Sequence, residues 1–164
     1  LIDVNVHGVV NGCQMFLPAM LASRSGQIVN IASAAAYHSL PFIGAYSASK
    51  AAVVSISETL HAENPANNIS VSTMISAFYK SDIASFTLGG EMARKRTSGL
   101  TKLARETAGD IATQTLRAVE ARKPYIVLTR DGRAVYFMKR HFPGIFLRLA
   151  PRIAKAAFAK AEAA

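Results

Sequence analysis

The 164-residue sequence has a single cysteine, Cys13, and no tryptophan. One thiol cannot form an internal disulfide, and so low a cysteine content is typical of proteins in a reducing, cytoplasmic setting. No apolar run reaches the roughly 18 residues that a membrane-spanning helix needs. The four histidines are scattered without the paired spacing of metal ligands, so we expect no metal site. Hydrophobic residues make up 51% of the chain, which favours one globular domain with a sizeable core.

Acidic residues are scarce in the C-terminal part of the chain. From Arg122 onward there are ten Lys or Arg and only two acids, Asp131 and Glu162, whereas the residues before Arg122 include nine Lys or Arg and eight acids. The formal net charge of +9 therefore belongs mainly to the tail. No nucleic-acid-binding motif accompanies this charge, so we expect no nucleic-acid partner.

The spacing of apolar residues predicts helices that alternate with short strands. Helices are expected over residues 1–21, 45–63 and 110–122, the last capped by Asp110, and strands over 27–32, 69–75 and 125–129. The strand at 27–32 is largely apolar, as strands buried on both faces of a parallel sheet are. This order of elements favours the α/β fold class.

One pair of residues in the second helix carries a chemical signal, Tyr46-x-x-x-Lys50. Residues four apart lie on one face of a helix, so the phenol and the ammonium can reach the same point. A free tyrosine, with a pKa of about 10, is a poor base near neutrality, but an adjacent cation favours the phenolate. Ser33 follows a predicted strand, at the edge where α/β sheets place ligands. A Tyr-x-x-x-Lys pair by itself is more often two ordinary residues on a half-buried helix face than a catalytic pair. The residues around it are therefore needed to distinguish the two interpretations.

The residues around this pair resemble the short-chain dehydrogenase/reductase family. The stretch Asp3–Gly8, the strand that ends in Ser33, and then Tyr46 and Lys50 occur in the order that this family shows. The resemblance runs from Leu1 to about Thr129. It implies a Rossmann-like, doubly wound parallel sheet that binds NAD or NADP and transfers hydride between an alcohol and a carbonyl.

The resemblance also implies a role for each residue of this set. Tyr46 would be the general acid/base and would contact the cofactor, and Lys50 would bind the nicotinamide ribose and favour the phenolate. The Ser33 hydroxyl would donate a hydrogen bond to the substrate oxygen. Asn5 would hold a water that links the lysine to solvent as a proton relay. From the residues alone, Asn5 is also readily explained as a core amide that its neighbours satisfy.

The end of the second predicted strand, at residue 75, departs from the family pattern. Relatives usually carry Pro-Gly there, followed by a hydrophobic residue and a threonine that contact the nicotinamide carboxamide. This chain has Ser76-Ala77 and then Tyr79 and Ser81. We expect Ser76, Tyr79 and Ser81 to contact the cofactor, with a bend that differs because a rigid and a permissive residue are both replaced.

The glycine-rich phosphate-binding turn with which this family begins, and its Asn-Ala-Gly stretch, are missing. The first residue is Leu and falls inside a helical pattern, so we expect the chain to begin within a domain. The sheet would then be incomplete, with an uncovered edge. The resemblance implies a homo-oligomer paired through the helices at 1–21 and 45–63. The alternative is an inactive fragment that acts only as an interaction or regulatory module.

We expect a partial catalytic domain over residues 1–131 and a basic amphipathic C-terminal extension over 132–164. In the extension, Pro151 is expected to open a helix that docks on the domain or on another subunit, or lies on an anionic membrane surface. Residues 81–108 correspond to the family's substrate loop. The apolar side chains of Phe86, Leu88, Met92 and Leu100 in this loop indicate a hydrophobic alcohol or ketone as substrate.

Overall fold

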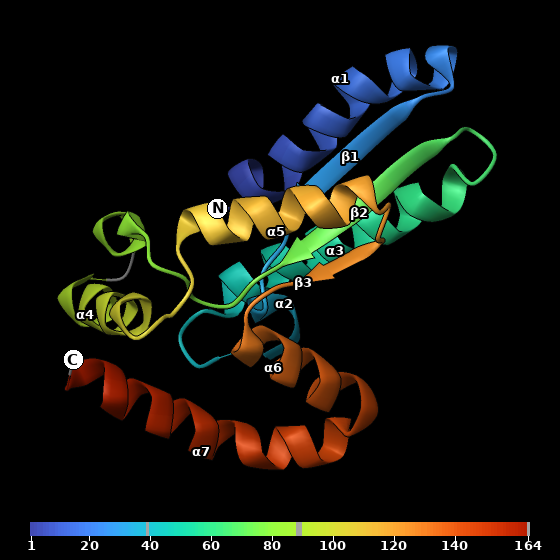
Figure 1. The fold of residues 1–164 in the computed structure, drawn as a ribbon. Coiled ribbons are helices and arrows are strands. Elements are labelled where there is room, and N and C mark those ends of the chain that lie inside the picture. The colour runs from blue at the N-terminus through green and yellow to red at the C-terminus, as the bar shows by residue number, and fades with distance from the viewer. Residues whose placement is uncertain (39, 88–89, 164) are drawn as a thin grey trace.

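A computed structural model of the chain describes residues 1–38, 40–87 and 90–163. Its strands form one parallel sheet in the order β1-β2-β3, with helices on both faces (Figure 1). In chain order, the elements are η1 (Asp3–His7), α1 (Gly8–Ser23), β1 (Gly26–Ile31), α2 (Ala35–His38), α3 (Gly44–Glu63), β2 (Ile69–Ile75), η2 (Asp82–Phe86), α4 (Gly90–Lys102), α5 (Ala108–Glu120), β3 (Tyr125–Val127), α6 (Arg130–His141) and α7 (Pro143–Glu162). The predicted α/β class with an incomplete parallel sheet is confirmed.

The central strand β2 joins the two halves of the core. It pairs with β1 from Gly26↔Ile69 to Ile31↔Met74, and with β3 from Thr73↔Tyr125 to Ile75↔Val127. Every residue of β2 is buried, because helices cover both of its faces. On one face α3 contributes Val53 and Val54, and on the other α5 contributes Ile111 and Val119.

Strand β1 forms an edge of the sheet. The Ala32 amide donates to the Met74 carbonyl on β2. Because successive residues of a strand turn their peptide groups to opposite sides, the Ile31 carbonyl faces away from β2. Within the described residues no strand pairs with that side of β1. The edge expected to be uncovered is therefore present, and Ile31 is 48% exposed there.

Three local details differ from the expected elements. The first turn of the N-terminal helix is π-helical, because the Gly8 amide bonds the Asp3 carbonyl five residues back. Thr107, and not Asp110, is the N-cap of α5; Asp110 completes a capping box by accepting the Thr107 amide at 2.8 Å. Pro151 lies inside α7 and does not begin it, and the helix continues because its later turns pack against α4.

The C-terminal helices extend the same body of the protein. Helix α6 begins at Arg130, so it spans the expected junction between residues 131 and 132. The Thr129 hydroxyl caps it by accepting the Gly132 amide at 3.1 Å, and it also accepts the Ala77 amide from the segment after β2 at 3.3 Å. The division of the chain into a catalytic domain and an extension stays a prediction. Among the described helices, none is long and apolar enough to cross a membrane.

Helix α7 docks on α4. Arg96 of α4 forms an ion pair with Glu162 at 2.8 Å, and its guanidinium lies 4.8 Å from the centre of the Phe158 ring. Gly99 is the point of closest approach, where a Cβ atom would lie 1.9 Å from the Ala161 carbonyl oxygen. The expected docking of the tail on the domain therefore takes place, and a glycine on α4 makes it possible.

We expect Gly99→Ala to destabilise the fold. Overpacking of this kind costs about 1–3 kcal/mol, and in a chain of this size each kcal/mol lowers Tm by about 2–4 °C. Gly12→Ala is the matched control, because a Cβ on Gly12 meets nothing within 4 Å and alanine favours the helix. Thermal unfolding of both variants checks this. An equal rise in Tm for the two would contradict the close packing of α4 and α7.

Candidate active site

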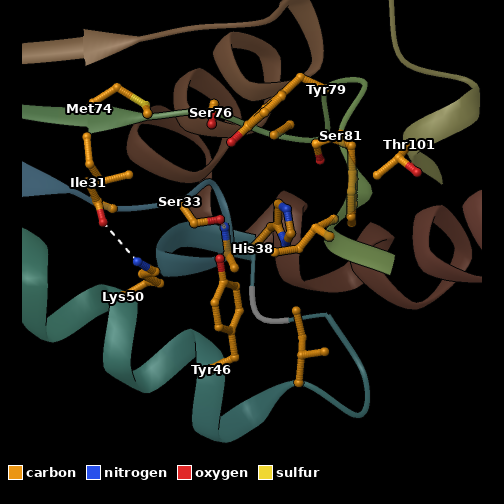
Figure 2. Close-up of a pocket in the computed structure, with 16 residues that line it drawn as sticks. Ile31, Ser33, His38, Tyr46, Lys50, Met74, Ser76, Tyr79, Ser81 and Thr101 are labelled. Carbon is orange, nitrogen blue, oxygen red and sulfur yellow. Dashed lines mark hydrogen bonds between the residues drawn. The ribbon is translucent and has the colours of Figure 1, made fainter. Parts of the chain in front are cut away.

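A cavity of about 270 Å³ lies at the carboxyl ends of β1 and β2 (Figure 2). Segments far apart in the sequence form its walls: the end of β1, α2, the start of α3, the segment after β2, and α4. The residues that line it are Ile31, Ala32, Ser33, Ala35, His38, Ile43, Tyr46, Lys50, Met74, Ser76, Ala77, Phe78, Tyr79, Ser81, Ile83 and Thr101. Six of the seven candidate residues from the sequence are among them; the seventh, Asn5, is not.

The phenol and the ammonium stand one helical turn apart on α3. The Lys50 Nζ atom lies 5.9 Å from the centre of the Tyr46 ring. The Tyr46 side chain rises from α3 with its hydroxyl toward Ser33 (Figure 2). The Ser33 Oγ atom accepts the Ala35 amide at 3.2 Å, so its own hydrogen is left to donate to a ligand. A phenol and a hydroxyl that is able to donate thus share one end of the cavity.

The open edge of the sheet holds Lys50. Its Nζ atom donates to the Ile31 carbonyl at 2.9 Å, the carbonyl that faces away from β2 (Figure 2). Burial lowers the pKa of the Lys50 ammonium. The hydrogen bond to Ile31 holds the ammonium of Lys50 beside the phenol of Tyr46. The Ile31 carbonyl can accept this bond because no described strand pairs with that side of β1.

Asn5 reaches the site indirectly. Its Nδ2 atom donates to the Ser49 hydroxyl at 3.0 Å, and that hydroxyl donates to the Tyr46 carbonyl at 2.7 Å. Ser49 is fully buried between η1 and α3. Asn5 therefore tethers the turn of α3 that carries the phenol, and it does so from a π-helical turn, which is often found at functional sites.

The segment after β2 bends without a left-handed residue, since neither Ser76 nor Ala77 has a positive φ. The Ser76 carbonyl accepts the Ala34 amide at 2.9 Å, which ties this segment to the end of β1. The amide of Ala77 is bonded to Thr129, as described above. Ser76, Tyr79 and Ser81 are brought to the cavity by these links.

Two polar residues of the cavity were not predicted from the sequence, His38 and Thr101. His38 lies on a helix of four residues, too short to show periodicity, and Thr101 arrives only through the packing of α4. The apolar walls also differ from expectation. Phe86 and Met92 are 78% and 57% exposed. Neither they nor Leu100 line the cavity, whereas Ile43, Phe78 and Ile83 do. Leu88 lies outside the described residues.

His38 is a half-buried imidazole in the wall of the cavity. Burial lowers its pKa, and its Nδ1 atom is buried with no partner among the described residues. A lowered pKa means that the unfolded chain takes up a proton at His38 at a higher pH than the folded chain does. The free energy of unfolding therefore falls as the pH drops below about 6.5, by at most about 1.4 kcal/mol per pH unit for one proton.

We expect His38→Gln to weaken the loss of stability between pH 7 and pH 5. Chemical denaturation at each pH measures the loss. His61→Gln is the control, because His61 is exposed on α3 and its replacement is expected to leave the pH dependence unchanged. An unchanged pH dependence in the His38 variant would show that another group controls acid stability.

The site thus offers a phenol, an ammonium and several hydroxyls around a partly apolar cavity. These groups can transfer a proton to or from an oxygen atom and can hold a polar ligand. Within the ranges that the structure describes, no three His, Cys, Asp or Glu side chains gather as metal ligands would.

Comparison with known proteins identifies the family to which the sequence and the fold are similar. A family model described as short chain dehydrogenase matches residues 1–88. Among curated proteins, dehydrogenase/reductase SDR family member 7C-B of Danio rerio is 31% identical over 151 residues, which cover 91% of this chain and 47% of that protein. The chain spans about half the length of this protein and of the related family members 7C and 7B of Mus musculus and 7C of Rattus norvegicus.

Solved structures show the same fold. A short-chain dehydrogenase/reductase from Burkholderia phymatum in complex with NAD matches with a TM-score of 0.69 and 32% identity, over 77% of this chain and 51% of that one. A short-chain dehydrogenase from Burkholderia cenocepacia in complex with NADP matches with a TM-score of 0.71 and 22% identity, over 90% of this chain and 56% of that one. Because the family model covers more than half of the sequence and the fold agrees, the chain belongs to the short-chain dehydrogenase family.

Proposed function

We propose that this chain is the catalytic portion of an NAD(P)-dependent oxidoreductase that interconverts an alcohol and a carbonyl compound. One observation carries the proposal: the Tyr46 phenol, the Lys50 ammonium and the Ser33 hydroxyl share one cavity at the carboxyl edge of a parallel sheet. Ligands of open α/β sheets bind at this edge. Membership of the family supports the same reaction class.

Each residue has a defined task in this proposal. Tyr46 donates a proton to the carbonyl oxygen in reduction and accepts one from the hydroxyl in oxidation. Lys50 stabilises the phenolate by its charge. Ser33 orients the substrate oxygen through the hydrogen that its contact with Ala35 leaves free. Asn5 supports the relay of protons, and its bond to Ser49 keeps the Tyr46 turn in position.

The residues of the cavity fit one end of a nicotinamide cofactor, NAD or NADP. Lys50 and Tyr46 would hold the ribose, and Ser76, Tyr79 and Ser81 would contact the nicotinamide. At about 270 Å³ the cavity is too small for a whole dinucleotide, so the pyrophosphate would be held outside it. When bound, the cofactor supplies or accepts the hydride. The bound NAD and NADP of the two related structures support this proposal.

The substrate that we propose is a small hydrophobic alcohol or ketone. The side chains of Ile43, Phe78 and Ile83 give the cavity an apolar wall next to the polar end at Ser33 and Tyr46. Such a wall contacts the carbon skeleton while the hydroxyls bind the reacting oxygen. The cytoplasmic location and the homo-oligomer expected from the sequence stay predictions.

Carbonyl reduction tests the proposed function. A protein that contains this sequence together with a nucleotide-binding half is assayed for NADH or NADPH oxidation with apolar and with charged ketones. We expect turnover with apolar ketones, and we expect Ser33→Ala to lower it by about 10²-fold to 10³-fold, the effect of losing one hydrogen bond to a reacting oxygen. Ser25→Ala, at an exposed serine far from the cavity, is the control. Unchanged turnover in the Ser33 variant would remove Ser33 from the mechanism.

A second candidate is an interaction or regulatory module without activity. The unpaired side of β1 favours it, together with side chains of η1 and α1 that are more than half exposed: Val4, Met15 and Phe16. An open strand edge beside an apolar surface can pair with another chain. Light scattering of the purified chain measures this association. A module would assemble with a partner while showing no nucleotide binding.

A further inference from the structure

The turn between α6 and α7 presents an apolar corner, formed by Phe137, Phe142 and Ile145. These side chains are 54%, 46% and 52% exposed. The Phe137 and Phe142 ring centres lie 6.2 Å apart, and the His141 ring lies 4.6 Å from the first and 6.5 Å from the second. The corner lies on the far side of the sheet from α1 (Figure 1). Because its side chains are about half exposed and lie close together, the corner is an apolar surface cluster and is not part of the core.

A basic stripe continues from this corner along α7. Arg148, Arg152 and Lys155 follow at steps of four and three residues, so they lie on one face of the helix, and all three are exposed. Residues 130–162 contain eight Lys or Arg and two acids. One of these acids, Glu162, is already paired with Arg96. The stripe is thus strongly positive, with little neutralisation from its own helix.

The other face of α7 is already occupied. Phe146, Ala154 and Ala161 are buried, and α4 and α6 are the neighbours of this helix. Packing against α4 and α6 therefore explains the apolar residues on the buried face of α7. It does not explain the apolar corner or the basic stripe, which are exposed. These two outer features adjoin each other, since Ile145 precedes Arg148 by three residues.

We propose that the outer face of α6 and α7 binds the surface of an anionic membrane. The apolar corner would enter the boundary between headgroups and acyl chains, and the basic stripe would contact the anionic headgroups. Apolar side chains beside a one-sided positive charge fit this partner, and no nucleic-acid-binding motif accompanies the charge. The contact that we propose is with the membrane surface.

Vesicle co-sedimentation tests this surface with the chain alone, independently of any nucleotide or activity. We expect binding to phosphatidylcholine vesicles that contain phosphatidylserine, weaker binding at high salt, and little binding to phosphatidylcholine alone. Arg148→Glu with Arg152→Glu should lower the partition coefficient at least tenfold. Lys95→Glu with Arg117→Glu changes the net charge equally at exposed sites on other helices and should retain binding.

A second variant tests the apolar corner. Phe142→Ser with Ile145→Ser keeps the charge and should also lower binding at least tenfold, while circular dichroism confirms that each variant is folded. Undiminished binding by this variant would mean simple attraction to polyanions and would overturn the proposal. So would equal binding to both kinds of vesicle, or an equal loss in the control pair.

Discussion

We expect Tyr46→Phe to lower kcat by about 10²-fold to 10⁴-fold in the oxidoreductase of which we propose that this chain is the catalytic portion. The variant retains the ring and loses only the hydroxyl, which Figure 2 shows directed toward Ser33. General acid/base catalysis contributes a factor of this size. Because Lys50 stays in place through its bond to Ile31 and can still hold the ribose, we expect nucleotide affinity to fall less than turnover does. Steady-state kinetics and a nucleotide titration measure the two quantities.

Tyr136→Phe is the matched control for this loss. Tyr136 lies outside the cavity, where its ring packs edge-on against Tyr37 with 5.0 Å between the ring centres. Its variant should retain nearly full turnover. If the Tyr46 variant also retained turnover, the proton would come from another group, and the proposed mechanism would be wrong.

Lys50→Met should lower kcat by about the same factor as Tyr46→Phe. It should also change the pH dependence of the reaction. The variant leaves a phenol without its neighbouring cation, 5.9 Å from the ring centre in the structure. The phenolate is then less favoured, so the pH at which oxidation of the alcohol reaches half its maximum should move upward. Nucleotide affinity should fall as well, which separates this variant from Tyr46→Phe.

Lys80→Met tests whether loss of any lysine has this effect. Lys80 is exposed and does not line the cavity, although it lies on the segment that carries Tyr79 and Ser81. It should leave the pH profile and the affinity unchanged. An unshifted pH profile for the Lys50 variant, with turnover reduced, would restrict Lys50 to holding the cofactor.

The regular elements could be predicted closely because their signals are local. Strand β2 was expected and found at 69–75, and α3 begins at Gly44, one residue before the expected start. The π-helical turn in η1 could not be foreseen, since it depends on a single shifted backbone bond. The continuity of α7 through Pro151 depends on its packing against α4, which apolar periodicity does not report.

In the candidate site, too, some features follow from local sequence and others only from tertiary packing. A motif and its order in the chain were enough to single out Tyr46, Lys50 and Ser33. The bond from Lys50 to Ile31 arises from the sheet edge, and the position of Thr101 arises from a helix brought in by tertiary packing. Such contacts join residues that share no local pattern, so only the folded structure could place them.

The central claim is that the cavity at the carboxyl edge of the sheet holds one end of a nicotinamide cofactor. A fluorescence titration of the 164-residue chain with NADH and NADPH tests it most directly. We expect saturable binding of at least one nucleotide in the micromolar to millimolar range, typical of a partial site, and a clear loss in the Lys50→Met variant. A folded sample that binds neither nucleotide, or a Lys50→Met variant that binds as well as the original chain, would contradict this account.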